Sequence, residues 1–200
     1  MKELIEYETK EISIIGISLR NIFVHNRDNF IETLTLAVRR NLKINIIMAN
    51  PQKVYLRARQ EAKDEGTLER EIIESTIGII NMINKTIRES ENISIKYYDG
   101  VPNNFSIIST NGILYSPYSN NQSAFISPLF YVKPNTELYN ILRSDYEFIV
   151  HNSLLAELEI RDKPKFKSSI ISLIKSENEL KNSIIPSEKE QEELIRSIAI

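Results

Sequence analysis

The sequence predicts an α/β domain in which a mixed β-sheet is flanked by helices on both faces, followed by a C-terminal helical appendage. Three observations support this. Short β-branched runs alternate with segments of helical period over roughly the first 90 residues. Closely spaced strand-like runs separated by turn residues follow, and after about residue 154 come two polar amphipathic segments interrupted by prolines. Strands joined through helices pair in parallel, whereas strands joined by tight turns pair antiparallel. We expect one domain over residues 1–152 and a helical tail over residues 153–200.

The first half of the chain predicts two buried strands with a helix between them. Ile12–Ser18 and Ile44–Met48 are almost wholly apolar, which is typical of strands buried on both faces, and Pro51 follows the end of the second. Asn29 resembles a helix N-cap before apolar residues at helical spacing, namely Phe30, Leu34, Val38 and Leu42. These patterns predict a parallel strand pair with a helical crossover.

The second half predicts further helices and a meander of strands. Val54–Lys63 and Leu68–Arg88 have helical patterns, and the longer one carries a single apolar stripe typical of packing on a sheet. Asn135–His151 is expected to be a third helix. Strands are expected at Ile93–Tyr98, Phe105–Ile108, Ile113–Tyr115, and Ala124–Ile126 continuing to Phe130–Val132.

Composition excludes several kinds of chemistry. The 25 Lys and Arg residues nearly balance 27 Asp and Glu, giving a formal net charge of -2, so net charge does not indicate nucleic-acid binding. Cysteine is absent, which excludes disulfides, thiolate metal ligands and cysteine nucleophiles. His25 and His151 stand apart without spaced carboxylates, and no glycine-rich phosphate loop occurs. We therefore expect no metal and no cofactor.

The chain shows no pattern of a membrane span or a signal peptide. Acidic residues lie near its N-terminus, and no uninterrupted apolar run approaches the roughly 18 residues that a membrane helix needs. These observations favour a soluble, cytoplasmic protein.

Candidate ligand-binding residues follow the predicted strands. Ser18 and Arg20 follow the first strand, Asn50 follows the second, and Asn104 and Ser106 lie at the mouth of a later one. Ligands of α/β sheets bind beyond the carboxyl ends of the strands, which makes these residues candidates. The alternative for Ser18 and Asn50 is turn formation or helix capping.

A further candidate is Arg57, which lies one helical turn beyond Lys53 in a predicted helix that follows a strand. Its guanidinium and the N–H groups at the start of that helix could together hold a phosphate or carboxylate. The alternative is that these basic residues form a solvated helical surface.

The stretch that begins at Asn104 reads N-F-S-(IIST)-N-(GILYSP)-Y-S-N-N, and it aligns without a gap to H-x-K-x4-D-x6-G-[SG]-x-N. The chain thereby resembles the phospholipase D-like family, whose signature this is. Ser119 and Asn121 fall on the Ser and Asn of the signature. Asn104, Ser106 and Asn111 replace its His, Lys and Asp.

The resemblance extends over roughly residues 10 to 152, since the order of strands and helices is similar to that of one phospholipase D-like half. In that family the His attacks a phosphodiester, while the Lys stabilises the charge that develops on the phosphoryl oxygens. Asparagine lacks a basic lone pair, and serine carries no charge. The replacements therefore imply that hydrolysis by this mechanism is lost.

Three hypotheses follow for function. The leading one is a catalytically degenerate phospholipase D-like domain that acts as a ligand-binding or regulatory module for an anionic or nucleotide-like ligand, or for a partner protein or fused module. The first alternative is an active phosphodiesterase or nuclease that uses replacement residues. The second is a purely structural dimerisation module. The candidate ligand-binding residues are Ser18, Arg20, Asn50, Arg57, Asn104, Ser106, Ser119 and Asn121.

The resemblance also implies a homodimer. Phospholipase D-like enzymes build one active site from two motif-bearing halves, and this chain has room for a single half. A lone half would leave the face that packs on its twin exposed, whereas pairing about a two-fold axis covers that face in both copies. The alternative is that the tail covers it within each monomer.

Overall fold

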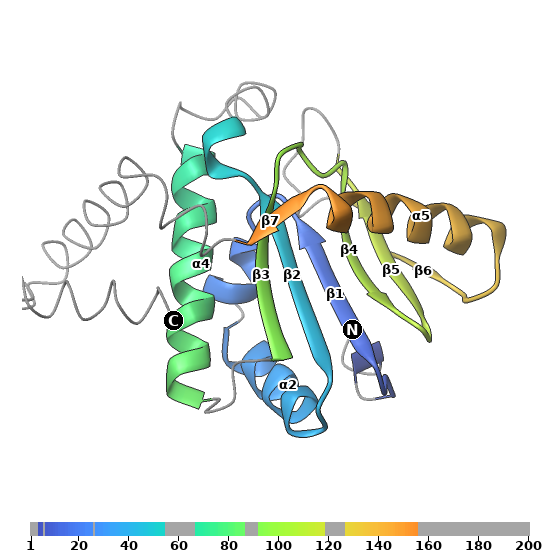
Figure 1. Ribbon diagram of the computed structural model, residues 1–200, viewed down its shortest axis with the longest axis horizontal. Helices are drawn as coiled ribbons and strands as arrows, with labels where there is room; N and C mark the ends of the chain where they lie inside the picture. The colour runs from blue at the N-terminus through green and yellow to red at the C-terminus, as the bar shows by residue number, and fades with distance from the viewer. Residues whose placement is uncertain are drawn as a thin grey trace, which may run out of the picture. The chain divides into compact units, whose positions relative to one another are not determined.

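The computed structural model describes residues 4–5, 7–25, 27–54, 67–86, 92–118 and 127–155 (Figure 1). The chain divides into two compact units, Met1–Ser153 and Leu154–Ile200. Nearly all of the described residues belong to the first unit, which contains the sheet and its helices.

The core of the first unit is a mixed sheet with the strand order β6-β5-β4-β1-β2-β3-β7. Strands β1 (Glu11–Gly16), β2 (Lys43–Ala49) and β3 (Ile93–Tyr98) are parallel. Strands β4 (Asn104–Ser109), β5 (Gly112–Pro117) and β6 (Phe130–Val132) form an antiparallel meander, in which β4 also pairs antiparallel with β1. Strand β7 (Ser153–Leu155) is the last in the order. The α/β fold with a mixed sheet is therefore confirmed.

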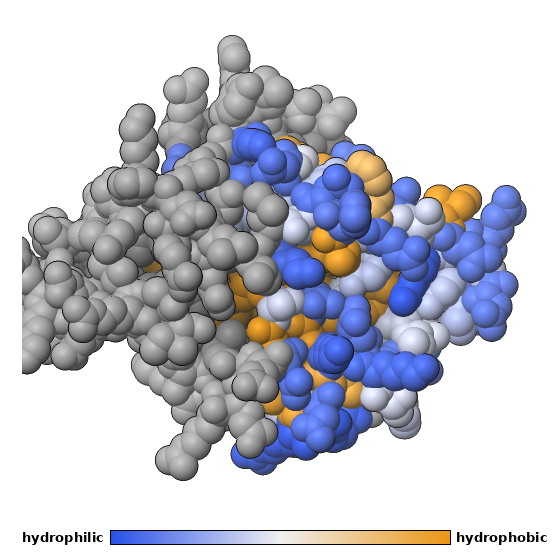
Figure 2. Space-filling model, in the orientation of Figure 1, coloured by the Kyte–Doolittle hydropathy of each residue, from blue (hydrophilic) through white to orange (hydrophobic). Residues whose placement is uncertain are grey.

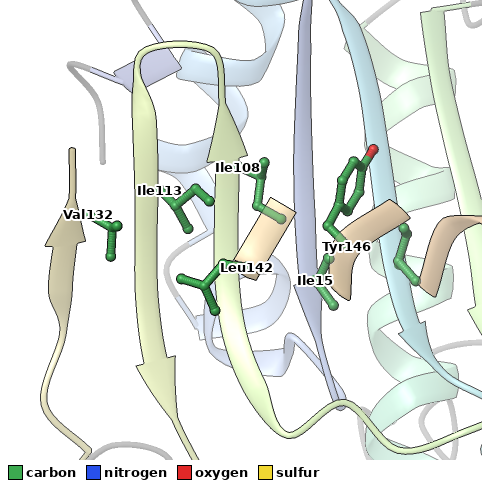
Figure 3. Close-up of a cluster of buried hydrophobic side chains, with 7 residues drawn as sticks. Ile15, Ile108, Ile113, Val132, Leu142 and Tyr146 are labelled. Carbon is green, nitrogen blue, oxygen red and sulfur yellow. The ribbon is translucent and has the colours of Figure 1, made fainter. Parts of the chain in front are cut away.

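Helices cover both faces of this sheet, as predicted (Figure 1, Figure 3). On one face lies α5 (Glu137–His151), which begins where the Thr136 hydroxyl accepts a hydrogen bond from the Tyr139 N–H over 3.2 Å. On the other face lie α2 (Arg27–Arg39) and α4 (Thr67–Thr86). Both connect parallel strands in the same direction across the sheet, and right-handed crossovers place such helices on one face. Two short elements, the π-helix η1 (Asn21–His25) and the 3-10 helix η2 (Pro51–Lys53), follow β1 and β2.

The face under α2 and α4 is lined by buried apolar side chains from the central strands. A buried polar pair joins helix and sheet on this face, because the hydroxyls of Thr76 in α4 and Tyr97 in β3 lie 2.7 Å apart. Ile93–Tyr98 matches its predicted bounds, and its register puts Tyr97 in line with Met48. The buried isoleucines of this face are Ile12, Ile14, Ile44, Ile46 and Ile107.

The face under α5 combines an apolar cluster with a polar network. Leu142 and Tyr146 of α5 pack against the cluster residues Ile15, Ile47, Ile108, Ile113 and Val132 (Figure 3). The Tyr146 hydroxyl also lies 2.5 Å from Ser13 Oγ and donates to Glu11 Oε1 over 2.9 Å. Asn45 Nδ2 donates to the same carboxylate oxygen over 2.8 Å. This network ties α5 to β1 and β2.

The N-terminal segment is anchored to the β4–β5 turn by Glu8, whose side chain is buried. Glu8 Oε2 accepts hydrogen bonds from the backbone N–H and the hydroxyl of Thr110, at 2.6 and 2.7 Å. Glu8 Oε1 accepts from the N–H groups of Thr9 and Lys10, at 2.8 and 2.9 Å. Glu8 therefore holds the end of the hairpin formed by β4 and β5.

Several predicted boundaries were wrong. Strand β1 ends at Gly16 and not at Ser18, because the chain turns at Leu19, which has a positive φ of 52°. Helix α2 begins at Arg27, so Asn29 lies inside the helix and is not its cap. Ser153–Leu155, the start of the predicted helical tail, forms a strand. The predicted helix within Val54–Lys63, the strand Ala124–Ile126 and the rest of the tail lie outside the described residues.

Among the helices that the structure describes, none is both long enough and apolar enough to cross a membrane.

Candidate functional site

The order in which the chain adds strands to the sheet reverses between β1 and β4. From β1 the chain moves across the sheet to β2 and β3, and then returns over residues 99–103 to the other side of β1, where β4 begins (Figure 1). The carboxyl ends of β1, β2 and β3 and the amino end of β4 therefore lie at one edge, called here the carboxyl edge. Such reversal points are where open α/β sheets bind ligands.

Asn104 and Ser106 lie at this reversal point on the face that α5 covers. Ser106 is paired with Ile15 of β1, and Asn104 is two residues earlier on the same side of β4. The buried Ser106 hydroxyl donates a hydrogen bond of 2.6 Å to Asn104 Oδ1. The pair offers amide and hydroxyl groups for hydrogen bonding, but neither a basic nitrogen nor a charge.

The end of β1 beside this pair has a strained backbone and close packing. Leu19 adopts the left-handed conformation, which is unusual for a bulky side chain and is found where surrounding contacts enforce it. Its carbonyl oxygen accepts from the N–H groups of Ile22 and Phe23, at 3.0 and 3.1 Å, and so begins η1. Nearby, the Tyr118 hydroxyl accepts from the Ile17 N–H over 3.3 Å.

Gly16 is required for this packing. A Cβ at Gly16 would lie 3.0 Å from the Tyr118 hydroxyl oxygen and would overlap the Leu19 side chain. We expect Gly16→Ala to lower the free energy of unfolding by about 1–3 kcal/mol, the usual cost of overpacking. Chemical denaturation followed by circular dichroism measures this. Gly78→Ala in α4, where the nearest atom would be 3.4 Å away, is the matched control and should be neutral or stabilising. Equal stability of the two variants would contradict the close packing at Gly16.

A second polar group at the carboxyl edge connects the ends of β2 and β3. The Nδ2 of the buried Asn50 donates to Asp99 Oδ1 over 2.9 Å, and Lys53 Nζ donates to Asp99 Oδ2 over 2.5 Å. Lys53 and Asp99 are about half exposed, so their charges are accessible to solvent. Asn50 thus anchors the start of the segment that crosses to β4, and Lys53 and Asp99 form a balanced pair of charges.

Sequence reasoning did not select Asp99. Its place was recognisable, because it follows β3 as Asn50 follows β2, and parallel strands in register bring their carboxyl ends together. Asp99 and Gly100 are typical turn residues, so a turn was sufficient to account for Asp99 and no binding role was assigned to it. Its pairing with Asn50 was therefore missed.

Among the described residues, Arg20 and Asn111 do not lie together with Asn104 and Ser106. Arg20 forms an ion pair of 2.9 Å with Glu74 of α4, on the face opposite α5, so it does not join Asn104. Ser18 is partly buried beside Leu19. Asn111 lies at the other end of β4, in the β4–β5 turn, where its Nδ2 donates to the Tyr7 carbonyl over 3.1 Å. Arg57, Ser119 and Asn121 lie outside the described residues, so their expected closeness to Asn104 stays a prediction.

No group of three or more His, Cys, Asp or Glu side chains with the arrangement of a metal site occurs within the described residues. At the carboxyl edge, Lys53 and Asp99 neutralise each other's charge.

No protein-family model and no curated protein sequence matches the chain. Among solved structures it is similar to phosphatidylserine synthase from Haemophilus influenzae Rd KW20, with a TM-score of 0.52 and 12% identity over 77% of this chain and 35% of that one. Nuc, a phospholipase D family member from Salmonella typhimurium, gives 0.48 and 12% identity, covering 77% of this chain and 86% of Nuc. TrmBL2, an archaeal chromatin protein whose structure shows a novel mode of DNA binding, gives 0.46 and 12% identity, covering 76% of this chain and 47% of TrmBL2.

These similarities concern the fold. The chain spans about half the length of TrmBL2 and about a third of that of the synthase. It is structurally similar to phospholipase D family members at low sequence identity, and its α/β fold is phospholipase D-like.

Proposed function

Starting from a phospholipase D-like fold with neutral residues at the start of β4, we propose that this protein is a non-catalytic domain that binds a small anionic or nucleotide-like ligand and acts as a regulatory module. The observation that carries the proposal is the hydrogen bond of 2.6 Å between Ser106 and Asn104. It engages the side chains that stand in place of the His and Lys of the resembled motif.

The chemistry of this pair supports binding over hydrolysis. Attack on a phosphodiester by a side chain needs a nucleophile with an available lone pair and a positive group near the phosphoryl oxygens. The Asn104 amide nitrogen is not basic, and the Ser106 hydroxyl is buried without an adjacent base among the hydrogen bonds described for it. Amide and hydroxyl groups do, however, serve well as hydrogen-bonding groups for a polar ligand.

Lys53 and Asp99 support the choice of ligand class. A bare anion would meet the Asp99 carboxylate beside the Lys53 ammonium, since the two lie 2.5 Å apart. A ligand with an anionic group and neighbouring hydroxyl groups can satisfy both, because the ammonium donates and the carboxylate accepts. A nucleoside monophosphate has this combination, and inorganic phosphate lacks the hydroxyl-bearing sugar.

Binding is tested with adenosine monophosphate and inorganic phosphate as probes, using calorimetry and thermal shift on the full chain. We expect the nucleotide to bind more tightly than phosphate, and Lys53→Met to weaken nucleotide binding by about tenfold or more, as expected for losing a charge-assisted hydrogen bond. Lys133→Met, at an exposed lysine after β6, is the matched control and should bind as the wild type does. Absence of binding of either probe at millimolar concentration, or equal losses in both variants, would overturn the proposed ligand class.

A separate assay tests the loss of catalysis. We expect the wild type to cleave neither bis(p-nitrophenyl) phosphate nor DNA, with or without magnesium or manganese, above the level of an Asn104→Ala, Ser106→Ala variant. Turnover by the wild type that disappears in this variant would reject the non-catalytic role and favour an active phosphodiesterase. A structural module would show neither turnover nor binding.

A further inference from the structure

Tyr115 lies beside the Asn104–Ser106 pair, on the face of the sheet that α5 covers. Ser106 is directly opposite Tyr115 in the antiparallel pairing of β4 with β5, and opposite Ile15 of β1 on its other side. Residues that face each other across two strands point to the same face, with Cβ atoms about 4.5–5.5 Å apart. Tyr115 is partly buried against the apolar cluster that contains Ile15. Its ring and the polar pair are therefore neighbours.

The packing of Tyr115 uses its ring and leaves its hydroxyl without a partner. Within the described ranges this hydroxyl makes no hydrogen bond. In contrast, the hydroxyl of Tyr139, which packs against the same cluster, donates to the Ser109 carbonyl oxygen over 3.1 Å. A partly exposed aromatic ring is a surface on which a planar base can stack. Tyr115 offers such a ring next to two hydrogen-bonding side chains.

The Asn104 amide is oriented by Ser106 and keeps hydrogen-bonding capacity. Its Oδ1 accepts from the Ser106 hydroxyl over 2.6 Å, which uses one of the two lone pairs of that oxygen. Its Nδ2 donates to no residue in the part of the chain that the structure describes. A donor and an acceptor thus stay available on a side chain that is only partly buried. An asparagine amide pairs through two hydrogen bonds with N7 and the N6 amino group of adenine.

The separation between Asn104 and Lys53 fits a nucleotide. Strands β4 and β2 both neighbour β1, so two strand spacings, about 10 Å, separate Asn104 from the end of β2, where η2 carries Lys53. This is comparable with the reach of a nucleoside monophosphate from its base to its phosphate. Figure 2 shows apolar side chains among hydrophilic ones on the surface in the region of α5, and a base, with an apolar ring and a polar edge, suits such a surface.

We propose that Tyr115 and Asn104 recognise the base of an adenine nucleotide. The Tyr115 ring stacks on the base, while Asn104 donates from Nδ2 to N7 and accepts from the N6 amino group at Oδ1. The inference rests on the proposed function, because it adds the base to the phosphate and sugar contacts of Lys53 and Asp99. Hypoxanthine presents two acceptors, O6 and N7, at the same edge, so the amide oxygen would meet O6 without a hydrogen between them. The site therefore favours adenine over hypoxanthine.

A series of three ligands tests base recognition on the full chain by calorimetry. We expect adenosine monophosphate to bind about tenfold or more tightly than inosine monophosphate or ribose 5-phosphate, since stacking and an amide pair each contribute about this factor. Equal affinity for adenosine monophosphate and ribose 5-phosphate would overturn base recognition and leave the proposed binding of a sugar phosphate intact. Binding of none of the three would overturn the proposed function itself.

Variants of Tyr115 test the stacking. Tyr115→Leu keeps an apolar side chain but removes the planar ring, so it should weaken adenosine monophosphate by about tenfold and leave ribose 5-phosphate unchanged. Tyr115→Phe keeps the ring and should bind as the wild type does, because the hydroxyl lost has no partner among the described residues. Tyr139→Leu, at the other ring of the cluster, is the control and should not affect binding. Undiminished binding of adenosine monophosphate by Tyr115→Leu would reject the stacking.

Variants of the polar pair test the reading of the base edge. Asn104→Ala should bring the affinities for adenosine and inosine monophosphate close together, because the amide that distinguishes them is gone. Ser106→Ala should reduce the preference in part, since the amide is then free to rotate and present Nδ2 to O6. A merely structural serine would lower both affinities and leave their ratio unchanged. A preference for adenine that persists in Asn104→Ala would overturn the role of Asn104.

Discussion

Replacing Tyr146 with alanine is expected to lower the free energy of unfolding by about 3–5 kcal/mol, the range for losing a large buried ring. The side chain is 5% exposed and packs against Ile15 and Ile47 on the face that α5 covers. Its hydroxyl also bonds Ser13 and Glu11. Denaturant unfolding followed by circular dichroism measures the loss. Tyr7→Ala, at a side chain that is 74% exposed, is the control and should change stability little.

Tyr146→Phe separates the hydroxyl from the ring. We expect a loss of about 1–2 kcal/mol, because Ser13 and Glu11 lose a hydrogen-bonding partner while the packing remains. A variant as stable as the wild type would show that the polar network contributes nothing to holding α5.

The Tyr146 phenol also makes stability depend on alkaline pH. Burial raises the pKa of Tyr146 from 10.0 to about 12, and the neighbouring Glu11 carboxylate acts in the same direction. A raised pKa contributes stability that is complete below the unfolded value near 10 and is lost as the pH rises towards 12. The wild type should therefore lose more stability between pH 10 and 12 than Tyr146→Phe does.

Replacing Glu8 with alanine is expected to cost about 2–3 kcal/mol, because the N–H groups of Thr9, Lys10 and Thr110 and the Thr110 hydroxyl lose their acceptor. The loss of stability is moderate because Thr9 and Thr110 are exposed, so water can replace the carboxylate there. Thermal and denaturant unfolding measure the effect. Glu147→Gln, at a carboxylate that is 68% exposed, is the control and should be nearly neutral.

Acid should weaken the same anchor. Burial raises the pKa of Glu8, but the hydrogen bonds from Thr110, Lys10 and Thr9 together outweigh it, so the net pKa lies below the ordinary 4.5. A lowered pKa contributes stability that is present above the unfolded value and is lost as the pH falls through the folded value. Below about pH 4.5 the wild type should lose more stability than Glu8→Gln. Parallel acid curves for the two proteins would contradict this role of Glu8.

Strands and helices whose conformation depends on residues adjacent in the sequence were predictable. Ile93–Tyr98 was predicted with the bounds that the structure has, because turn residues follow it. Phe130–Val132 was predicted as the end of a longer run that begins at Ala124, and the structure forms β6 there. The long helix predicted over Leu68–Arg88 corresponds to α4, whose apolar stripe recurs at helical spacing. The alternation of strands with helices before residue 98 and with turns after it was enough to predict a mixed sheet.

Boundaries that depend on neighbouring elements were less accurate. The apolar pattern of the first strand continues to Ile17, yet β1 ends at Gly16, where Leu19 and Tyr118 crowd the chain. Nothing local to Ser153–Leu155 distinguishes a strand from the start of a helix, and the place of β7 in the order next to β3 decides it. Strand formation there depends on a partner that is about 60 residues away in the sequence.

The sequence by itself determined the α/β class and the neutral character of Asn104 and Ser106, which carry neither a basic nitrogen nor a charge. Only the tertiary structure decided which polar groups meet: Ser106 with Asn104, Asn50 with Asp99, and Glu8 with Thr110. It also assigned Arg20 to Glu74, on the face away from α5. The physical reason is that the spacing of residues determines local conformation, whereas contacts between Glu8 and Thr110 or Arg20 and Glu74 depend on strand register and on the helix packed against each face.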